Sequence, residues 1–480
     1  MTDLILFWHR RDLRISDNLG LAAAREQSPK VVGVFCLDPD ILETGDVAPP
    51  RAVYLMGSLA ELERRYQAAG SRLVILKGDP RQKIPALAAA LGAKAVFWNR
   101  DVEPYSRDRD RTVAQALKEK GIEIRTTFWD QLLHGPEEIA SGSGSPYTVY
   151  TPFWKNWVRQ AKATPVAALA GTEDLTASEQ VLAEGVGAIA LPTAKDLGFV
   201  WDTPLLLPPG EAAAQERLEY FCQGQPVNEY GEQRNFPGVE GTSHLSAALK
   251  FGTIGVRQVW AEAAVAFEQA RSDETRDNVQ TWQQELAWRE FYQHAIYHFP
   301  ELTQGPYRDP LKDFPWDDND ENFTAWCEGR TGYPIVDAAM RQMNEIGWMH
   351  NRCRMIVASF LCKDLIINWQ AGEKYFEQRL YDWDLSANNG GWQWSASSGM
   401  DPKPLRIFNP ASQAQKYDPD GEYIRQWLPE LRHLDTEMLV SGKIPLDECD
   451  RSGYPRPIVD HKKQQARFKD KYNAQKARLA

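Results

Sequence analysis

The sequence has few features of a disulfide-rich, secreted or membrane-spanning protein. Its six cysteines include no Cys-x-x-Cys pair, and a chain of 480 residues gains little from cross-links, so reduced thiols are expected. No stretch approaches the roughly 20 apolar residues that a membrane helix needs. The short apolar run before His9 is not typical of a signal peptide. These absences favour a cytoplasmic protein without a membrane partner, and we expect it to act as a monomer.

Several common catalytic and cofactor motifs are also missing. No G-x-G-x-x-G follows a strand and opens a helix, and Gly142-Ser143-Gly144 is more typical of a flexible loop. There is no nucleophile elbow. His294 and His298 are four residues apart, but the Glu of H-E-x-x-H and a third ligand are lacking, so we expect no metal site. An ordinary dinucleotide-binding domain, a serine hydrolase and a zinc protease are therefore disfavoured.

Positive charge is scarce overall. The net charge is −11 and the calculated pI is about 5.4, which argues against a general nucleic-acid-binding surface. The last twenty residues nevertheless carry seven Lys or Arg against one Asp, and arginines cluster near Trp and Asn motifs in the second half. Any DNA binding would therefore have to use a local basic groove.

The length and the residue patterns predict two domains of different class. A chain of 480 residues exceeds what one core usually serves. Over residues 1–131, short apolar runs alternate with helical patterns such as 52–69 and 81–91, which predicts a doubly wound, parallel α/β domain. The strand candidates are Leu4–Trp8, Val31–Leu37, Leu73–Lys77, Ala95–Trp98 and Ile122–Thr126. Ligands in such folds lie beyond the carboxyl ends of the strands.

The rest of the chain contains a connector and a helical domain. Residues 132–207 are rich in Gly, Ser, Thr, Pro and Ala and are interpreted as an interdomain connector with some helix. Residues 208–480 show almost only helical periodicity. The helical segments expected there are 211–223, 245–270, 275–298, 334–346 and 349–368.

The segment from Asp382 to Pro410 is the most unusual in composition. Adjacent Gly390 and Gly391 weaken regular structure and suggest that another group approaches the backbone closely. On a helix, Trp392 and Trp394 are separated by about 200° and would face opposite ways, each lining a different site. The alternative is a glycine-relieved turn with two packed tryptophans, and the local pattern does not decide between them.

Three other segments carry candidate binding residues. Thr242 or Ser243 is a natural N-cap of the following helix, where a pyrophosphate could also bind. Trp282, Glu285 and Arg289 should share one helix face, where Glu285 is either a surface partner of Arg289 or an acid facing a ligand. Asn351 and Met355 should also face the same way. Arg354, if buried, needs an anionic partner such as Asp382 or Asp384.

These motifs occur in an order that identifies a family. From Phe7-Trp8-His9-Arg10-Arg11-Asp12-Leu13-Arg14 to Gly453-Tyr454-Pro455, the chain resembles the photolyase/cryptochrome family, and most closely the class I photolyases of cyclobutane pyrimidine dimers. The resemblance implies an α/β antenna domain joined by a long loop to a helical domain that binds FAD and DNA. The residues that it assigns to FAD are Tyr230, Thr242, Ser243, Leu245, Ser246, Trp282, Glu285, Arg289, Asn351, Arg354, Asp382, Asp384 and Asn388.

The resemblance also implies an activity. Light-excited reduced flavin gives one electron to a pyrimidine dimer, the cyclobutane ring splits, and the electron returns. The dimer would be flipped out of the duplex, as photolyases do. The catalytic residues would be Glu285, Asn351 and Asn388, with Trp288, Met355 and Trp394 around the dimer. Candidate DNA contacts are Arg234, Trp288, Arg289, Arg352, Trp394, Arg406 and Lys416, and the electron relay would be Trp392, Trp369 and Trp316.

A second pigment is expected in the α/β domain. The sequence resembles the members that carry an 8-hydroxy-5-deazaflavin antenna, with methenyltetrahydrofolate as the alternative pigment. The residues assigned to the antenna by this resemblance are Phe35, Cys36, Leu37, Asp38, Arg51, Asp101, Glu103, Arg109 and Lys250.

Two other functions compete with dimer repair. A cryptochrome photoreceptor would bind FAD and signal without repair, but only a short basic tail follows Tyr454, and Trp288, Met355 and Trp394 are all present. Repair of (6-4) photoproducts would use paired histidines. The matching region here offers Asn351 and Met355, and His350 should face away by helical rotation.

Overall fold

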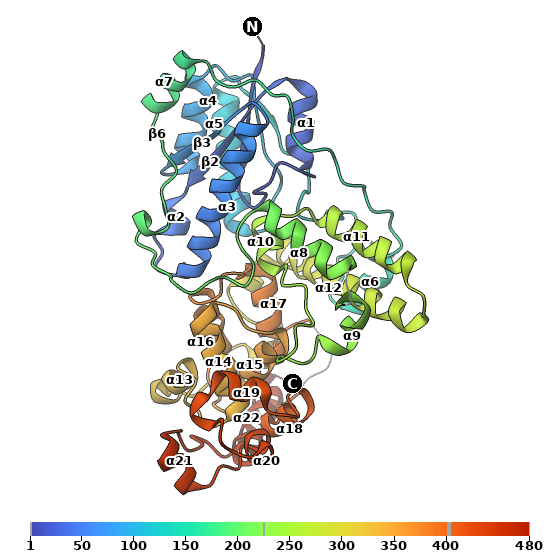
Figure 1. Cartoon of the computed structure of the whole chain (residues 1–480), viewed down its shortest axis with the longest axis vertical. Helices are drawn as coiled ribbons and strands as arrows, with labels where there is room; N and C mark the ends of the chain where they lie inside the picture. The colour runs from blue at the N-terminus through green and yellow to red at the C-terminus, as the bar shows by residue number, and fades with distance from the viewer. Residues whose placement is uncertain (1, 224–225, 401–404, 480) are drawn as a thin grey trace.

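The first part of the chain forms an α/β domain around one sheet. A computed structural model describes residues 2–223, 226–400 and 405–479. The sheet has the strand order β5-β4-β1-β2-β3-β6. It lies in the blue, N-terminal part of the molecule, where Figure 1 labels β2, β3 and β6. Its strands are β1 Leu4–His9, β2 Lys30–Leu37, β3 Leu73–Lys77, β4 Ala95–Phe97, β5 Glu123–Arg125 and β6 Ala188–Ile189. The first five strands are parallel, as the sequence predicts.

The sixth strand was not predicted. β6 has only two residues and pairs antiparallel with β3 at the sheet edge, with Ile75 opposite Ile189. It lies in the segment interpreted as a connector, so part of this segment completes the sheet. The boundaries at residues 131 and 207 remain a prediction.

Alternating side chains place the two faces of the sheet in different cores. Ile5 and Phe7 of β1 belong to the core that includes α1 and α3, whereas Leu6 and Trp8 pack with α4 and α5. The first of these cores continues without interruption into the helical domain through Leu218, Phe221, Leu245 and Phe251. The α/β helices are α1 Leu19–Gln27, α2 Pro39–Leu42, α3 Pro49–Ala68, α4 Pro80–Ala90 and α5 Pro104–Glu119.

The second domain is helical, and all strands of the described chain lie before residue 190. Two helices of the connecting segment are α6 Tyr150–Trp157 and α7 Ala177–Gly185. The following helices are α8 Glu211–Gln223, α9 Tyr230–Gln233, α10 Ser246–Phe251, α11 Val256–Gln269, α12 Asp273–His298, α13 Asp320–Cys327, α14 Pro334–Ile346, α15 Asn351–Lys363, α16 Trp369–Glu377, α17 Leu385–Ala396, α18 Pro410–Tyr417, α19 Glu422–Trp427, α20 Thr436–Ser441, α21 Leu446–Ser452 and α22 His461–Leu479.

Two predicted helices are shorter than expected. The segment 245–270 is divided into α10 and α11 at Gly252, which has φ of +64°, and a Cβ there would lie 2.1 Å from the backbone oxygen of Arg11. The helix expected over 349–368 ends at Lys363, and Ile366 has a positive φ of 57° before α16 begins at Trp369. Both breaks bring the chain close to other segments.

Polar contacts tie the two domains together. Arg14 and Arg257 are both buried and share the carboxylate of Asp130, at 2.7 Å each. Arg51 of α3 donates to the backbone oxygens of Glu377 at 2.7 Å and Leu380 at 3.2 Å. The relative position of the domains therefore depends on buried charges, which need these partners.

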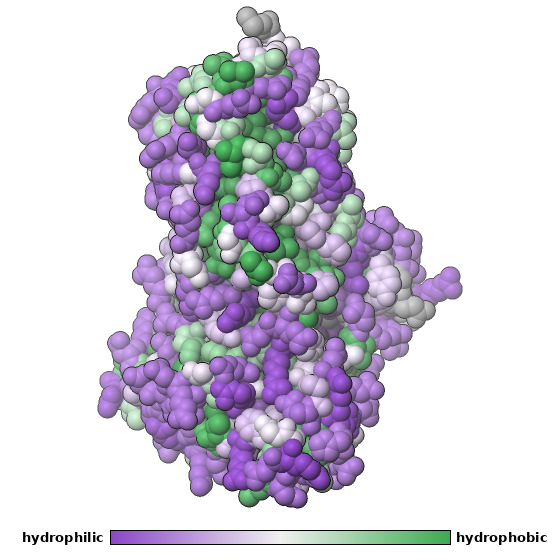
Figure 2. Space-filling model, turned by 60° about the vertical axis from the view of Figure 1, so that its left-hand side comes forward, coloured by the Kyte–Doolittle hydropathy of each residue, from purple (hydrophilic) through white to green (hydrophobic). Residues whose placement is uncertain are grey.

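The face of the α/β domain that is seen in Figure 2 carries an apolar band. In Figure 2, hydrophobic side chains gather along the upper half of the molecule, while the lower half is mainly hydrophilic. Exposed apolar residues of this domain include Ile41, Val181 and Ile189. Among the helices of the described residues, none combines the length and apolar character that crossing a bilayer requires.

Candidate cofactor and substrate cavity

One large cavity in the helical domain collects the predicted cofactor residues. Its volume is about 580 Å³, and its walls come mainly from α10, α12, α15 and α17. This size falls in the range of ligand pockets, roughly 300–1,000 Å³. All the residues assigned to FAD line it: Tyr230, Thr242, Ser243, Leu245, Ser246, Trp282, Glu285, Arg289, Asn351, Arg354, Asp382, Asp384 and Asn388.

Helix α12 supplies one wall of the cavity. Trp282, Glu285 and Arg289 share the face that lines it, as their spacing predicts. Of the two alternatives for Glu285, the surface pair with Arg289 is wrong, because Glu285 lines the cavity and forms an ion pair with Arg234. Arg289 donates instead to the backbone oxygens of Gln131 at 2.7 Å and Leu249 at 3.1 Å. Burial raises the pKa of Glu285, although Arg234 opposes this shift.

The two acids before α17 hold different arginines. Arg354 Nη2 donates to both oxygens of Asp382, at 3.0 and 2.8 Å, which confirms that Arg354 has an acidic partner. Asp384 instead forms an ion pair with Arg11 from the α/β domain and accepts from Ala387 N at 3.0 Å as the N-cap of α17. Arg11 was not predicted here, because the contact joins two segments that are far apart in the sequence.

The asparagines of α17 are held by Glu373 of α16. Asn388 Nδ2 donates to the backbone oxygen of Glu373 at 3.2 Å, so the amide oxygen is the end offered to a ligand. Asn389 Nδ2 donates to the Glu373 carboxylate at 2.9 Å. Burial raises the pKa of Glu373 to about 7. The role of Glu373 has no local signal in the sequence.

The segment 382–396 is a capped helix rather than a glycine-relieved turn. Gly390 is needed because a Cβ would lie 2.2 Å from the ring of Tyr292, whereas Gly391 lines the cavity and has open space beside it. Trp392 packs on Phe376 with centroids 5.0 Å apart, and Trp394 lies near Arg406 and Phe408. The two indoles face different neighbours, yet both line the same cavity.

The expected N-cap at residues 242–243 is wrong. The N-cap of α10 is Leu245, without a side-chain hydrogen bond, so neither Thr242 nor Ser243 caps the helix. Both residues line the cavity, as does Ser246. Their hydroxyls are therefore placed beside the cavity and not at the cap.

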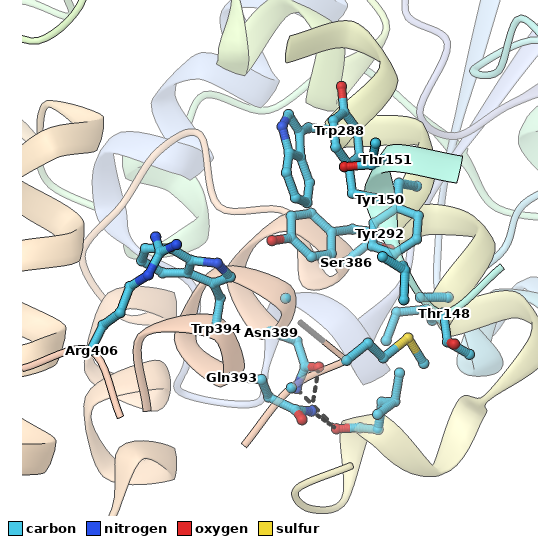
Figure 3. A pocket seen from close by; sticks show the side chains of 18 residues that line it. Thr148, Tyr150, Thr151, Trp288, Tyr292, Ser386, Asn389, Gln393, Trp394 and Arg406 are labelled. Atoms are coloured by element: carbon cyan, nitrogen blue, oxygen red, sulfur yellow. Dashed lines mark hydrogen bonds between the residues drawn. The ribbon is translucent and has the colours of Figure 1, made fainter. Parts of the chain in front are cut away.

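The residues expected around the dimer lie at the same cavity. Trp288, Met355 and Trp394 all line it, and Trp288 and Trp394 also border an adjoining cavity of about 280 Å³. Figure 3 shows Tyr150 beside Trp288, with Trp394 and Arg406 across this second cavity. The ring centroids of Tyr150 and Trp288 are 3.5 Å apart and the planes differ by 6°. Tyr150 was not predicted as a site residue.

All the predicted phosphate contacts except Lys416 line one of these two cavities. Arg234 and Arg352 are half-buried and line the larger cavity. The guanidinium of Arg406 lies 5.3 Å from the Trp394 ring centre, and Lys416 Nζ lies 5.2 Å from that of Tyr417. Arg406 and Lys416 are exposed. His350 is buried at the N-cap of α15, where its ring accepts from Arg352 N at 3.1 Å.

The three relay candidates belong to one apolar cluster. Trp392 and Trp369 are buried in it, and half-buried Trp316 packs against it.

The two histidines spaced like metal ligands contact backbone oxygens. His294 Nε2 lies 2.9 Å from the backbone oxygen of His134, and His298 Nε2 lies 3.0 Å from that of Pro136.

The antenna candidates gather mostly at the carboxyl ends of the parallel strands. Asp38 accepts from Tyr105 OH at 2.6 Å and lies 3.9 Å from Arg109. Arg11 contacts Asp101 and Glu103, and Lys250 lies in the same charged group. Burial raises the pKa of Glu103 to about 7 and lowers that of Lys250 to about 8.

Not every antenna candidate faces this group. Phe35 and Leu37 belong to the core on one side of the sheet, and Cys36 belongs to the core on the other side. Arg51 donates to the backbone oxygens of Glu377 and Leu380 in the helical domain and of Asp46 in the α/β domain. The structure therefore brings together the charged candidates Asp38, Asp101, Glu103, Arg109 and Lys250 more closely than the others.

The larger cavity has the donor set that a flavin dinucleotide requires. Hydroxyls of Thr242, Ser243 and Ser246 could bind a pyrophosphate, and aromatic walls suit a flavin ring. The buried indole nitrogens of Trp383 and Trp392 have no hydrogen-bond partner among the described residues, although both residues line the cavity. A ligand with acceptor groups would fit these walls.

Comparison with known proteins agrees with this geometry. Residues 282–474 match the family described as the FAD binding domain of DNA photolyase, and residues 5–170 match the family described as DNA photolyase. A deoxyribodipyrimidine photo-lyase from Synechococcus is 59% identical over 476 residues, covering 99% of this chain and 98% of that protein.

Solved structures share the whole fold. The crystal structure of a bacterial class III photolyase from Agrobacterium tumefaciens has a TM-score of 0.88 and 36% identity, covering 99% of this chain and 98% of that chain. The Synechocystis cryptochrome structure also has a TM-score of 0.88, at 29% identity, and covers 98% and 99%. With its sheet, its helical cavity and these relatives, the chain belongs to the photolyase/cryptochrome family.

Proposed function

We propose that this chain is a light-driven DNA repair enzyme that splits cyclobutane pyrimidine dimers and uses one cavity for both FAD and the flipped dimer. One observation carries the proposal. The residues assigned to FAD and the residues assigned to the dimer, including Trp288, Met355 and Trp394, line the same cavity. Reduced FAD, when bound there, supplies the electron that light transfers to the dimer and that returns after ring splitting.

The protein contributes position and a dry environment. Trp288 and Trp394 present aromatic surfaces to the extruded pyrimidine dimer, and base–aromatic stacking is worth about 1–3 kcal/mol per base. Glu285 of α12 and Asn351 of α15 offer hydrogen-bonding groups to the same cavity. Arg234 holds the partly buried Glu285 in an ion pair. These groups act by orientation, because the chemistry belongs to the cofactor.

Asn388 is proposed to face the flavin ring at N5. Its amide nitrogen is held by the Glu373 backbone, which leaves a neutral oxygen as the acceptor. A neutral amide adds no negative charge beside an anionic reduced ring, whereas an aspartate would.

DNA binding is proposed to be local. The net charge of −11 repels a polyanion at long range, so affinity has to come from local cations and from the pocket. Arg234, Arg289, Arg352, Arg406 and Lys416 are the proposed phosphate contacts. The two pyrimidines of a dimer are already poorly stacked, so flipping them out of the duplex costs less free energy than flipping intact bases.

An antenna pigment is proposed for the α/β domain. The charged group of Asp38, Asp101, Glu103, Arg109 and Lys250 lies near the strand ends where α/β folds bind ligands. We propose 8-hydroxy-5-deazaflavin as the pigment and methenyltetrahydrofolate as its alternative. The absorption spectrum of pigments extracted from the purified protein distinguishes the two.

Illumination of the purified, reduced protein with damaged DNA tests the proposed function. Recovery of monomeric pyrimidines from cyclobutane dimers in the light, and none in the dark, is the expected result. Bound flavin without any recovery would favour a photoreceptor, and recovery only from (6-4) photoproducts would favour that other repair activity. A denatured extract without flavin would contradict the cofactor assignment.

A further inference from the structure

We propose that Tyr150 is a positioning residue that holds the Trp288 indole in place for damage recognition. This inference rests on the proposed function, because it concerns the pocket that receives the dimer. Tyr150 is the first residue of α6, in the segment between the sheet and the helical domain. This segment thereby becomes part of the recognition site rather than only a connection.

The contact between the two rings is close and nearly parallel. Their centroids are 3.5 Å apart with planes inclined by 6°, so Tyr150 covers one face of the indole. Figure 3 shows Tyr150 on one side of Trp288 and Trp394 on the other. The uncovered face of Trp288 is therefore the one that is available to a base.

The tyrosine hydroxyl fixes the ring to the helix that carries Trp288. Tyr150 OH donates to the backbone oxygen of Gln284 at 2.9 Å, and Gln284 precedes Trp288 by one turn of α12. Burial raises the pKa of the phenol, so the hydroxyl stays protonated and keeps its donor role. The ring is thus held at its hydroxyl end by α12 and at its backbone end by α6.

The other aromatic neighbours of Trp288 cannot replace this contact. Phe291 and Tyr292 lie 5.8 and 5.6 Å from its ring centre, but both are on α12 itself and approach at 85° and 31°. Tyr150 is the parallel partner that comes from a different element. Phe153 anchors α6 against α12 through Phe291, with centroids 5.3 Å apart, so the support is itself packed.

A fixed indole should increase affinity for the flipped dimer. Without Tyr150, Trp288 would have to be ordered each time that DNA binds, and this ordering opposes binding. The effect should be confined to damaged DNA, because undamaged DNA leaves the pocket empty. Tyr150 is therefore predicted to affect discrimination and not general affinity.

Three variants of the full-length flavoprotein test the proposal. Tyr150→Leu removes the stacked ring, and Tyr150→Phe keeps the ring without its hydroxyl bond. Tyr147→Leu is a matched control, since Tyr147 is an aromatic residue of the same segment that packs on Phe153 and Asn156. Dissociation constants for damaged and undamaged DNA are measured in the dark, and repair rates are measured at limiting and saturating DNA.

The expected result is a selective loss in one variant. Tyr150→Leu should weaken binding of damaged DNA about 3- to 10-fold, the range of an aromatic pair. Its binding of undamaged DNA, flavin content and repair rate at saturating DNA should match the wild type. Tyr150→Phe should recover most of the loss, and Tyr147→Leu should behave as the wild type.

Other results overturn the proposal. Wild-type affinity in Tyr150→Leu would show that the stack is unimportant, and tighter binding would show that Tyr150 occupies the place of the dimer. Equal weakening for both DNAs would indicate a general structural role. If the wild type itself fails to discriminate between damaged and undamaged DNA, the proposed function fails. Crystal structures of the wild type and of Tyr150→Leu then test the positioning role of Tyr150 separately. This role is supported if the Trp288 indole turns in the variant and refuted if it stays in place.

Discussion

The ion pair between Arg354 and Asp382 should contribute measurably to stability, and Asp382→Asn tests this. Asn keeps the size of the side chain but removes its charge. In the wild type, Arg354 Nη2 donates to both carboxylate oxygens of Asp382, at 3.0 and 2.8 Å, and Arg354 Nε donates to the Met349 backbone oxygen at 2.8 Å. The variant removes the charge and one acceptor, and the Met349 bond remains.

The burial of the two partners determines how much stability the variant should lose. Breaking a fully buried pair costs about 3–5 kcal/mol, whereas an exposed pair contributes about 0–1 kcal/mol. The Asp382 side chain is 2% exposed and that of Arg354 is 26% exposed, so this pair lies between the two limits. We expect a loss of about 2 kcal/mol for Asp382→Asn, which is roughly 2–4 °C in the melting temperature of a chain of this length.

The assay is thermal unfolding of each protein with and without bound flavin. The release of flavin from each protein is measured as well. Asp450→Asn is the control, because Asp450 forms a 3.0 Å pair with Arg456 in which both side chains are more than half exposed. The control should melt as the wild type does. If Asp382→Asn melts as the control and retains its flavin, the reasoning from burial is refuted.

Three further predictions concern electron transfer, DNA binding and pH. Trp392→Phe should block light-driven reduction of oxidised flavin, followed by absorbance, while repair persists with chemically reduced flavin; normal photoreduction would exclude Trp392 from the relay. Lys416→Ala should weaken the binding of damaged and undamaged DNA alike and lower the slope of log affinity against log salt by about one unit. Trp288→Ala should lose about 1–3 kcal/mol of binding free energy for damaged DNA only. Exposed Lys416 tests this better than Arg406, which lies against Trp394. Burial raises the pKa of Glu373 from 4.5 to about 7, so the unfolded carboxyl ionises first as pH rises. Relative to Glu373→Gln, the wild type should therefore lose at most about 3 kcal/mol of folding stability as the pH rises from 4.5 to 7. Melting temperatures of the two proteins that change in parallel over this pH range would contradict this.

Elements set by local patterns were predictable from the sequence. The five parallel strands follow from short apolar runs, and the amphipathic face of α12 follows from the spacing of Trp282, Glu285 and Arg289. The partner of Arg354 follows from the need of a buried cation for an anion, although the sequence left Asp382 and Asp384 as alternatives.

Features that depend on distant segments were not predictable. The break at Gly252 exists because the backbone of Arg11 approaches it, and the pairing of Arg11 with Asp384 crosses between domains. The stack of Tyr150 on Trp288 and the bonds from Glu373 have the same origin. In each case the partner lies far along the chain, and local propensity carries no information about it. The two-residue strand β6 is too short for any periodicity.

The central claim is that one cavity holds both the flavin and the flipped dimer. A crystal structure of the protein with dimer-containing DNA, prepared in the dark, tests it most directly. The expected result is a dimer outside the duplex, between Trp288 and Trp394 and beside the flavin. A dimer that remains stacked in the duplex, or that is bound away from these tryptophans, would contradict the account.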